Sequence, residues 1–92
     1  MDMSTANLTP CEHVVFTDFD EGEGILVDLN TKKYYQLNET AKLIWKGLEQ
    51  GKSLSQIVEE VIACYDVSPD HAARSVQRTV DSFQSYKLVS AQ

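Results

Sequence analysis

The chain has 92 residues, of which 42% are hydrophobic, and its 14 acidic and 8 basic residues give a net charge of −6. A chain of this length forms one small domain with a single core, and its acidic balance argues against binding to nucleic acids or anionic membranes. No apolar stretch is long enough to span a bilayer, and the N-terminus lacks a secretory signal pattern. Two distant cysteines, Cys11 and Cys64, indicate free thiols. We therefore expect a cytoplasmic protein.

The first part of the chain carries little structural signal. Residues 1–11 are mostly small and polar and include Pro10, which predicts a flexible N-terminal arm. The folded domain is expected over residues 12–90. Within it, β-branched and aromatic residues between His13 and Phe19 favour a first strand. The acidic, glycine-bearing loop 20–24 then reverses the chain.

A second strand is predicted directly after this loop. In residues 25–29, the apolar residues Ile25, Val27 and Leu29 alternate with their neighbours. This period of two is typical of a half-buried strand. We therefore expect these three side chains to share the buried face.

A turn leads into a third strand over residues 33–37. Here Tyr35 and Leu37 are expected on the buried face, and Tyr34 and Gln36 on the opposite one. The connection lengths predict a three-stranded antiparallel β-meander. If the strands lie side by side in chain order, the third strand is an edge.

Three helices are predicted after the strands. Asn38 has the side chain of a helix cap, and the first helix should end near Gly51, which tolerates a left-handed conformation. Ser53 opens the second helix with the spacing of a capping box. Ser68 caps the third, which should run to about Tyr86. The predicted fold is α+β and winged-helix-like, a three-stranded meander followed by a three-helix bundle.

Residues that could carry out catalysis or bind a metal do not form a complete pattern. His13 and His71 lie far apart in the sequence, and neither has an evident nucleophile beside it. Cys11 and His13 supply only two metal ligands, and the acidic loop lacks the order of a calcium site. We therefore expect no enzyme, no catalytic residue, no metal site and no cofactor.

Two binding functions remain open on these patterns. The second and third helices, with the hairpin as a wing, suggest a winged-helix DNA-binding protein, although Arg74 and Arg78 give the third helix little positive charge. Alternatively, the edge strand accepts an added peptide strand beside a helix face made small by Ala72 and Ala73. In the second case Lys32, Lys33 and the two arginines would favour an acidic peptide. The lysines could equally serve to protect the edge against aggregation, and two copies could pair through it as a homodimer.

A resemblance to a known family is carried by four sequence runs, LVDLNTKKYYQLNETAKLIW (26–45), SLSQIVEEV (53–61), YDVSPDHA (65–72) and YKLV (86–89). Together they resemble the PqqD family of small peptide chaperones, whose fold is also the recognition element of ribosomal peptide (RiPP) maturation. The resemblance implies a non-catalytic protein that binds the leader region of a ribosomally made precursor peptide as an added strand. It would present the leader to a modifying enzyme, often a radical SAM protein, in pyrroloquinoline quinone or other natural product biosynthesis.

The resemblance also implies where the peptide binds, which is between the third strand and the third helix. The positions carried over from the family are Lys33, Tyr34, Tyr35, Gln36, Leu37, Arg74, Val76, Gln77, Arg78, Val80 and Asp81. Lys32 stands in the hairpin turn where Gly or Asn is usual in the family, so the strand register is an open question at this stage.

Overall fold

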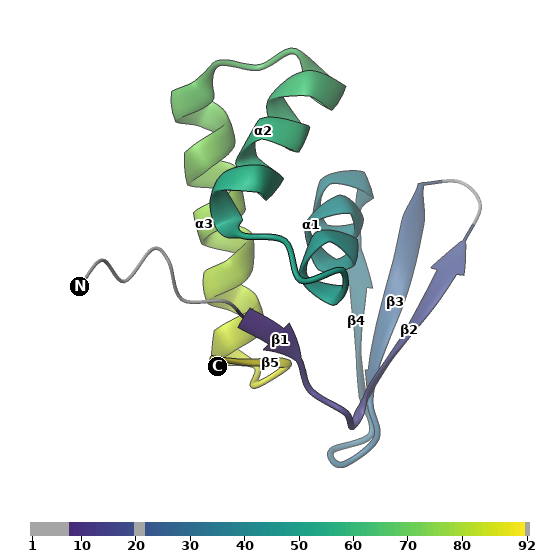
Figure 1. The fold of residues 1–92 in the computed structure, drawn as a ribbon. Helices are drawn as coiled ribbons and strands as arrows, with labels where there is room; N and C mark the ends of the chain where they lie inside the picture. Colours follow the sequence, from purple (N-terminus) through teal and green to yellow (C-terminus); the bar gives the residue numbers. More distant parts are fainter. Residues whose placement is uncertain (1–7, 20–21, 92) are drawn as a thin grey trace.

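A computed structural model describes residues 8–19 and 22–91 of the chain. Its main sheet has the antiparallel order β2-β3-β4, and three helices follow it (Figure 1). Helix α1 contacts the sheet on one side and α2 and α3 on the other. The elements are β1 (Leu8–Pro10), β2 (Val14–Phe19), β3 (Glu23–Asp28), β4 (Lys33–Leu37), α1 (Glu39–Glu49), α2 (Leu54–Tyr65), α3 (Pro69–Ser85) and β5 (Val89–Ala91).

The predicted helix caps are all present. The side-chain oxygen of Asn38 accepts a hydrogen bond from the Ala41 N–H at 2.9 Å. Ser53 and Gln56 form a reciprocal capping box, with bonds of 3.2 and 3.0 Å. Ser68 caps α3 by accepting from the first turn of that helix. Each cap satisfies N–H groups that a helix leaves unpaired at its start, which fixes where each helix begins.

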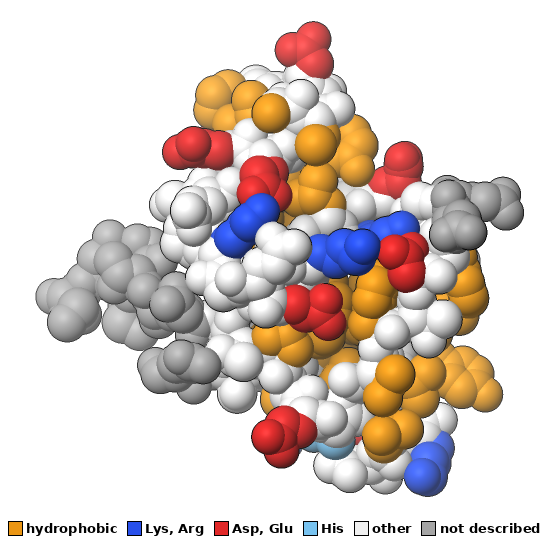
Figure 2. Space-filling view, turned by 45° about the vertical axis from the view of Figure 1, so that its right-hand side comes forward, with side chains coloured by type: hydrophobic (Ala, Val, Ile, Leu, Met, Phe, Trp, Pro, Cys, Tyr) orange, Lys and Arg blue, Asp and Glu red, His pale blue; other side chains and the backbone are white. Residues whose placement is uncertain are grey.

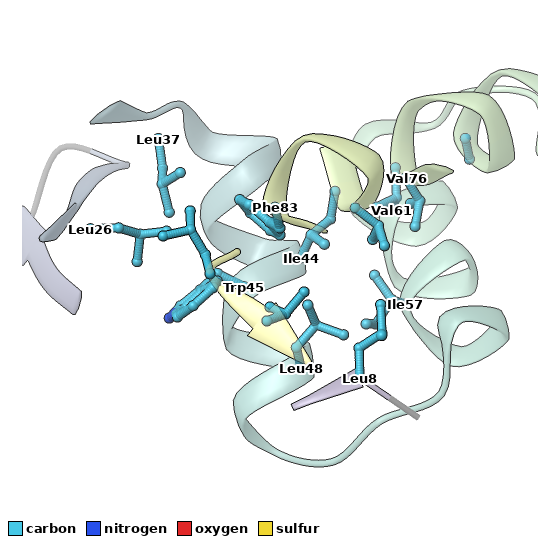
Figure 3. Packing of buried hydrophobic residues seen from close by; sticks show 14 residues of the cluster. Leu8, Leu26, Leu37, Ile44, Trp45, Leu48, Ile57, Val61, Val76 and Phe83 are labelled. Atoms are coloured by element: carbon cyan, nitrogen blue, oxygen red, sulfur yellow. The ribbon is translucent and has the colours of Figure 1, made fainter. Parts of the chain in front are cut away.

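The buried face of β3 is the opposite of the one predicted. Leu26 is fully buried, whereas Ile25 and Val27 are half-buried on the other face and Leu29 is 47% exposed. Figure 3 shows Leu26 reaching from the sheet toward Trp45 of α1. Apolar residues do alternate along this strand, but Ile25 and Val27 lie on the side of the sheet that points away from α1. On β4 the predicted faces are confirmed.

The core is organised around α1. Trp45 and Ile44 are fully buried, and the ring of Phe83 from α3 meets Trp45 edge-on at 5.3 Å and 84° (Figure 3). The indole N–H of Trp45 donates to the Glu49 carboxylate at 3.1 Å, so this polar atom is satisfied within its own helix. Apolar residues of α2 and α3 complete the same cluster. Helix α1 thereby holds the sheet against the other two helices.

The irregular arm expected over residues 1–11 does not extend over residues 8–10. These residues form β1, which pairs antiparallel with β5, and Leu8 is buried in the core. The Cys11 N–H continues the pairing by donating to the Leu88 carbonyl at 2.9 Å. The domain therefore begins before residue 12, while residues 1–7 lie outside the described part. Pairing between the two ends of a chain leaves no local sequence pattern.

The β3–β4 turn is anchored by Asp28, which is 3% exposed. Its carboxylate accepts from the N–H groups of Asn30 (2.9 Å) and Thr31 (3.2 Å) and lies 3.8 Å from the His13 ring nitrogen. Burial alone would raise the pKa of Asp28, but these hydrogen bonds and His13 outweigh it and hold the pKa below its ordinary value. Lys32 adopts a left-handed φ of 65°, the conformation for which Gly or Asn is usual. The anchored turn thus sets the β4 register despite a lysine at this position.

Among the described helices, none combines the length and the apolar character that crossing a membrane requires.

Candidate functional site

Strand β4 has one unpaired edge within the described part of the chain. The sheet order β2-β3-β4 makes β4 an outer strand. Strand β5 pairs with β1 and not with β4, so the described residues leave this edge open. An open edge offers N–H and C=O groups to another extended chain.

The hydrogen-bond pattern shows which residues of β4 face outward. The Leu29 N–H donates to the His13 carbonyl at 2.9 Å, so the odd-numbered residues of β3 direct their main-chain groups toward β2. Because this direction alternates along a strand, the even-numbered residues face β4, where they pair with Lys33, Tyr35 and Leu37. Tyr34 and Gln36 therefore point their N–H and C=O groups out of the sheet.

A groove of about 460 Å³ runs beside this edge, between β4 and the C-terminal half of α3. Its lining consists of strand residues, helix residues and the segment after α3: Tyr34, Tyr35, Gln36, Leu37, Ala41, Arg78, Thr79, Ser82, Phe83, Tyr86 and Leu88. Leu37, Phe83 and Leu88 are each less than 5% exposed and belong to the core. The groove is thus an extension of the hydrophobic core that opens to the surface beside the free edge.

Two tyrosines connect the walls of the groove. The rings of Tyr35 on β4 and Tyr86 at the end of α3 lie 4.6 Å apart with an interplanar angle of 32°. Tyr86 is 52% exposed, and Tyr34 on the same strand is 75% exposed. Exposed aromatic rings next to an apolar groove are typical of a binding surface, because they supply large contact areas with little loss of conformational entropy.

Arg78 is the cation of the groove. The neighbouring Arg74 is engaged with Asp70 at 3.0 Å, one helical turn away. Gln77 and Asp81 are likewise bonded to each other at 2.9 Å. In the described ranges 8–19 and 22–91, no hydrogen bond or ion pair is found for the Arg78 side chain. Arg78 is therefore available to an anionic group on a ligand.

The structure brings together part of the predicted peptide-binding set. Tyr34, Tyr35, Gln36, Leu37 and Arg78 line the groove. Lys33 begins β4 and lies outside the lining. The remaining surface positions share a shallow depression on α3 beside Arg78, and these are Arg74, Gln77 and Asp81.

Val76 and Val80 are not among the residues that line the groove. Both are 1% exposed and form part of the hydrophobic core. The small residue Ala72 is also buried, and no residue of α3 before Arg78 lines the groove. The apolar stripe of this helix is occupied by its packing against the rest of the bundle.

Six lining residues were missed by the sequence analysis: Ala41, Thr79, Ser82, Phe83, Tyr86 and Leu88. Thr79, Ser82 and Tyr86 are spaced by three and four residues, so they share one side of a helix. That stripe could have identified the groove wall. This stripe was not considered in the sequence analysis.

The described residues contain no group of three or more His, Cys, Asp or Glu side chains that could hold a metal ion. His13 lies beside Asp28 at the hairpin turn, and His71 lies in the first turn of α3. Cys11 and Cys64 are free thiols. What the site offers is therefore a strand edge, an apolar groove and one available cation.

Comparison with known proteins agrees with this geometry. The model of the family described as Coenzyme PQQ synthesis protein D (PqqD) matches residues 23–89. A structure described as TbiB1 in complex with the TbiA(beta) leader peptide superposes with a TM-score of 0.82 at 27% identity, over 88% of this chain and 93% of that one. A lasso peptide synthetase B1 complexed with the leader peptide gives 0.83 at 26% identity, over 92% and 99%. No curated protein sequence matched significantly.

Proposed function

The chain belongs to the PqqD family, and we propose that it is a non-catalytic peptide chaperone that binds the leader region of a ribosomally made precursor peptide. The leader adds as a strand to the free edge of β4 and is presented to a modifying enzyme. The observation that carries this proposal is the position of an apolar groove directly beside an unpaired strand edge. The leader-peptide complexes of the two similar structures support it.

The energetics require both the edge and the groove. Tyr34 and Gln36 each offer one N–H and one C=O group. At about 0.5 to 1.5 kcal/mol net for each hydrogen bond, these contribute roughly 2 to 6 kcal/mol. A micromolar complex needs about 8 kcal/mol, and the leader also loses conformational entropy when it becomes ordered. Burial of apolar leader side chains in the groove must supply the difference, so the groove determines which peptide binds.

The groove also defines the kind of leader. Side chains of an added strand alternate between the two faces of the sheet, so every second residue points toward α3. The buried Leu37, Phe83 and Leu88 favour apolar side chains at those positions. Arg78 at the rim favours an acidic residue nearby. We expect a leader segment of alternating apolar residues that carries a carboxylate.

The partner enzyme and the cellular location belong to the same proposal. A non-catalytic chaperone depends on a separate enzyme to modify the precursor, and radical SAM enzymes are one such class. Precursor peptides are made on cytoplasmic ribosomes, which favours action in the cytoplasm. Binding to DNA is disfavoured because Arg74 is engaged with Asp70 and the chain carries a net charge of −6.

Titration of the isotopically labelled chain with a synthetic leader peptide that has alternating apolar residues and a carboxylate tests the proposal. We expect amide shifts at Tyr34 and Gln36 and along residues 78–88, with no comparable effect of a DNA duplex. Shifts confined to α2, near Tyr65, would contradict the proposed site. The mass of the chain over a range of concentrations tests whether two copies pair through β4, which would compete with the leader.

A further inference from the structure

The face of the main sheet that points away from α1 is strongly apolar. The strand register places its residues in cross-strand rows, in which side chains point to the same side. The rows are Val15, Val27 and Tyr34; Thr17, Ile25 and Gln36; and Phe19 and Glu23. Glu23 is the one charged residue in these rows. We call these eight residues the outer face.

The outer face is exposed to a degree that is unusual for such side chains. Val15 is 43% exposed, Phe19 is 42% exposed and Tyr34 is 75% exposed, and Leu29 beyond the end of β3 is 47% exposed. Hydrophobic side chains gather on the side of the molecule that carries the sheet (Figure 2). An antiparallel sheet that faces water normally carries polar residues on that side. A contiguous apolar patch of a few hundred Å² on a soluble protein is often a functional site.

We propose that the outer face docks the modifying enzyme, an inference that rests on the function proposed above. The argument is continuity with the leader site. Tyr34 and Gln36 direct their side chains to the outer face and their main-chain groups to the leader. A leader strand added to β4 widens the same face from three strands to four. The enzyme is the partner that must contact both the chaperone and the bound precursor.

The size and charge of the outer face favour the enzyme over a second copy of the chain. At about 4.8 Å between strands and about 3.3 Å per residue, the face measures roughly 15 Å by 20 Å, or about 300 Å². A stable interface needs about 800 Å² on each partner. Two copies would also bring together two net charges of −6. The enzyme can add contacts to the leader itself, and its docking surface should be an apolar patch bordered by basic side chains.

It follows that the enzyme binds the chaperone more tightly when the leader is present. The test uses the whole 92-residue chain, a precursor peptide that it binds, and the enzyme that modifies this precursor. The variant V15T/F19T replaces two exposed apolar side chains of the outer face by threonine, which is more polar and still favours a strand. The variant Y65S removes an exposed aromatic ring from α2 as the matched control. Leader binding and enzyme binding are each measured by calorimetry, with and without the other component.

We expect V15T/F19T to bind the leader as the wild type does and to weaken enzyme binding by at least about tenfold, while Y65S changes neither by more than about twofold. Enzyme binding that is unaffected by V15T/F19T would overturn the docking surface while leaving the leader site intact. If the wild type is a dimer and V15T/F19T is a monomer, the outer face binds a second copy of the chain and the proposal of enzyme docking is wrong. Failure of the wild type to bind any leader would instead overturn the proposed function.

Discussion

The ring of Tyr35 on β4 lies 4.6 Å from the ring of Tyr86, the residue that ends α3. These two elements form the opposite walls of the groove. An aromatic contact between them sets how far apart the walls stand at this point. The width of the groove at this point therefore depends on two side chains that are distant in sequence.

Replacing Tyr86 by Ala should weaken leader binding by roughly five- to tenfold, because it removes an exposed ring from the groove and releases the contact with Tyr35. Because an aromatic pair is worth about 0.5 to 1.5 kcal/mol, the free energy of unfolding should fall by about 1 kcal/mol. Tyr86→Phe keeps the ring and should behave like the wild type in both respects. Calorimetric titration and urea unfolding measure the two effects. Equal binding by the Ala and Phe variants would exclude a role of the ring.

The outward N–H of Gln36 gives a second prediction. Gln36→Pro removes this donor, and because proline is tolerated on an edge strand the fold should persist. Loss of one main-chain hydrogen bond and disturbance of the neighbouring register should weaken leader binding by about tenfold or more. Gln36→Ala removes the side chain but keeps the N–H, and should bind within about threefold of the wild type. If the Ala variant binds the leader as weakly as the Pro variant does, the Gln36 side chain and not its N–H is responsible for binding. The strand-addition geometry is then wrong.

The two arginines of α3 form a matched pair for a third prediction. Arg78 lines the groove, whereas Arg74 is engaged with Asp70. Arg78→Gln should weaken binding of an acidic leader about three- to tenfold at low salt and less in high salt, since exposed charge pairs are screened. Arg74→Gln should have an effect below about twofold. Titrations at two salt concentrations distinguish these outcomes, and equal effects of both substitutions would show that only the general charge of the helix matters.

Most of the fold was predictable because its signals are local. The caps at Asn38, Ser53 and Ser68 and the faces of β4 all depend on residues within a few positions of each other, and all are confirmed. The pairing of β1 with β5 was not predictable in this way, because it joins the two ends of the chain. A strand of three residues also has too few positions to show a periodic pattern.

Two differences between the predictions and the structure have a common physical cause. The resemblance to the PqqD family placed Val76 and Val80 on or near the groove, but they do not line it, because the bundle buries that stripe. On β3, both faces carry apolar residues, so alternation alone could not show whether Leu26 or Ile25 faces α1. A pattern of apolar residues predicts a surface that another element or another molecule covers. It does not identify that element or molecule. The apolar outer face that misled this prediction is the same surface that we propose as a docking site.

The anchored turn before β4 should make stability depend on pH in the acid range. The hydrogen bonds to Asp28 lower its pKa in the folded state, so below neutral pH the unfolded chain binds the proton more readily. The stabilisation is therefore present above the ordinary carboxyl pKa of about 4 and is lost as the pH falls through the folded value. Asp28→Asn should destabilise the protein at pH 7, and its difference from the wild type should shrink toward pH 2. Urea unfolding across this range measures the difference, with Glu59→Gln, an exposed carboxylate on α2, as the control. A difference that stays constant with pH would mean that Asp28 acts through the shape of its side chain and not through its charge.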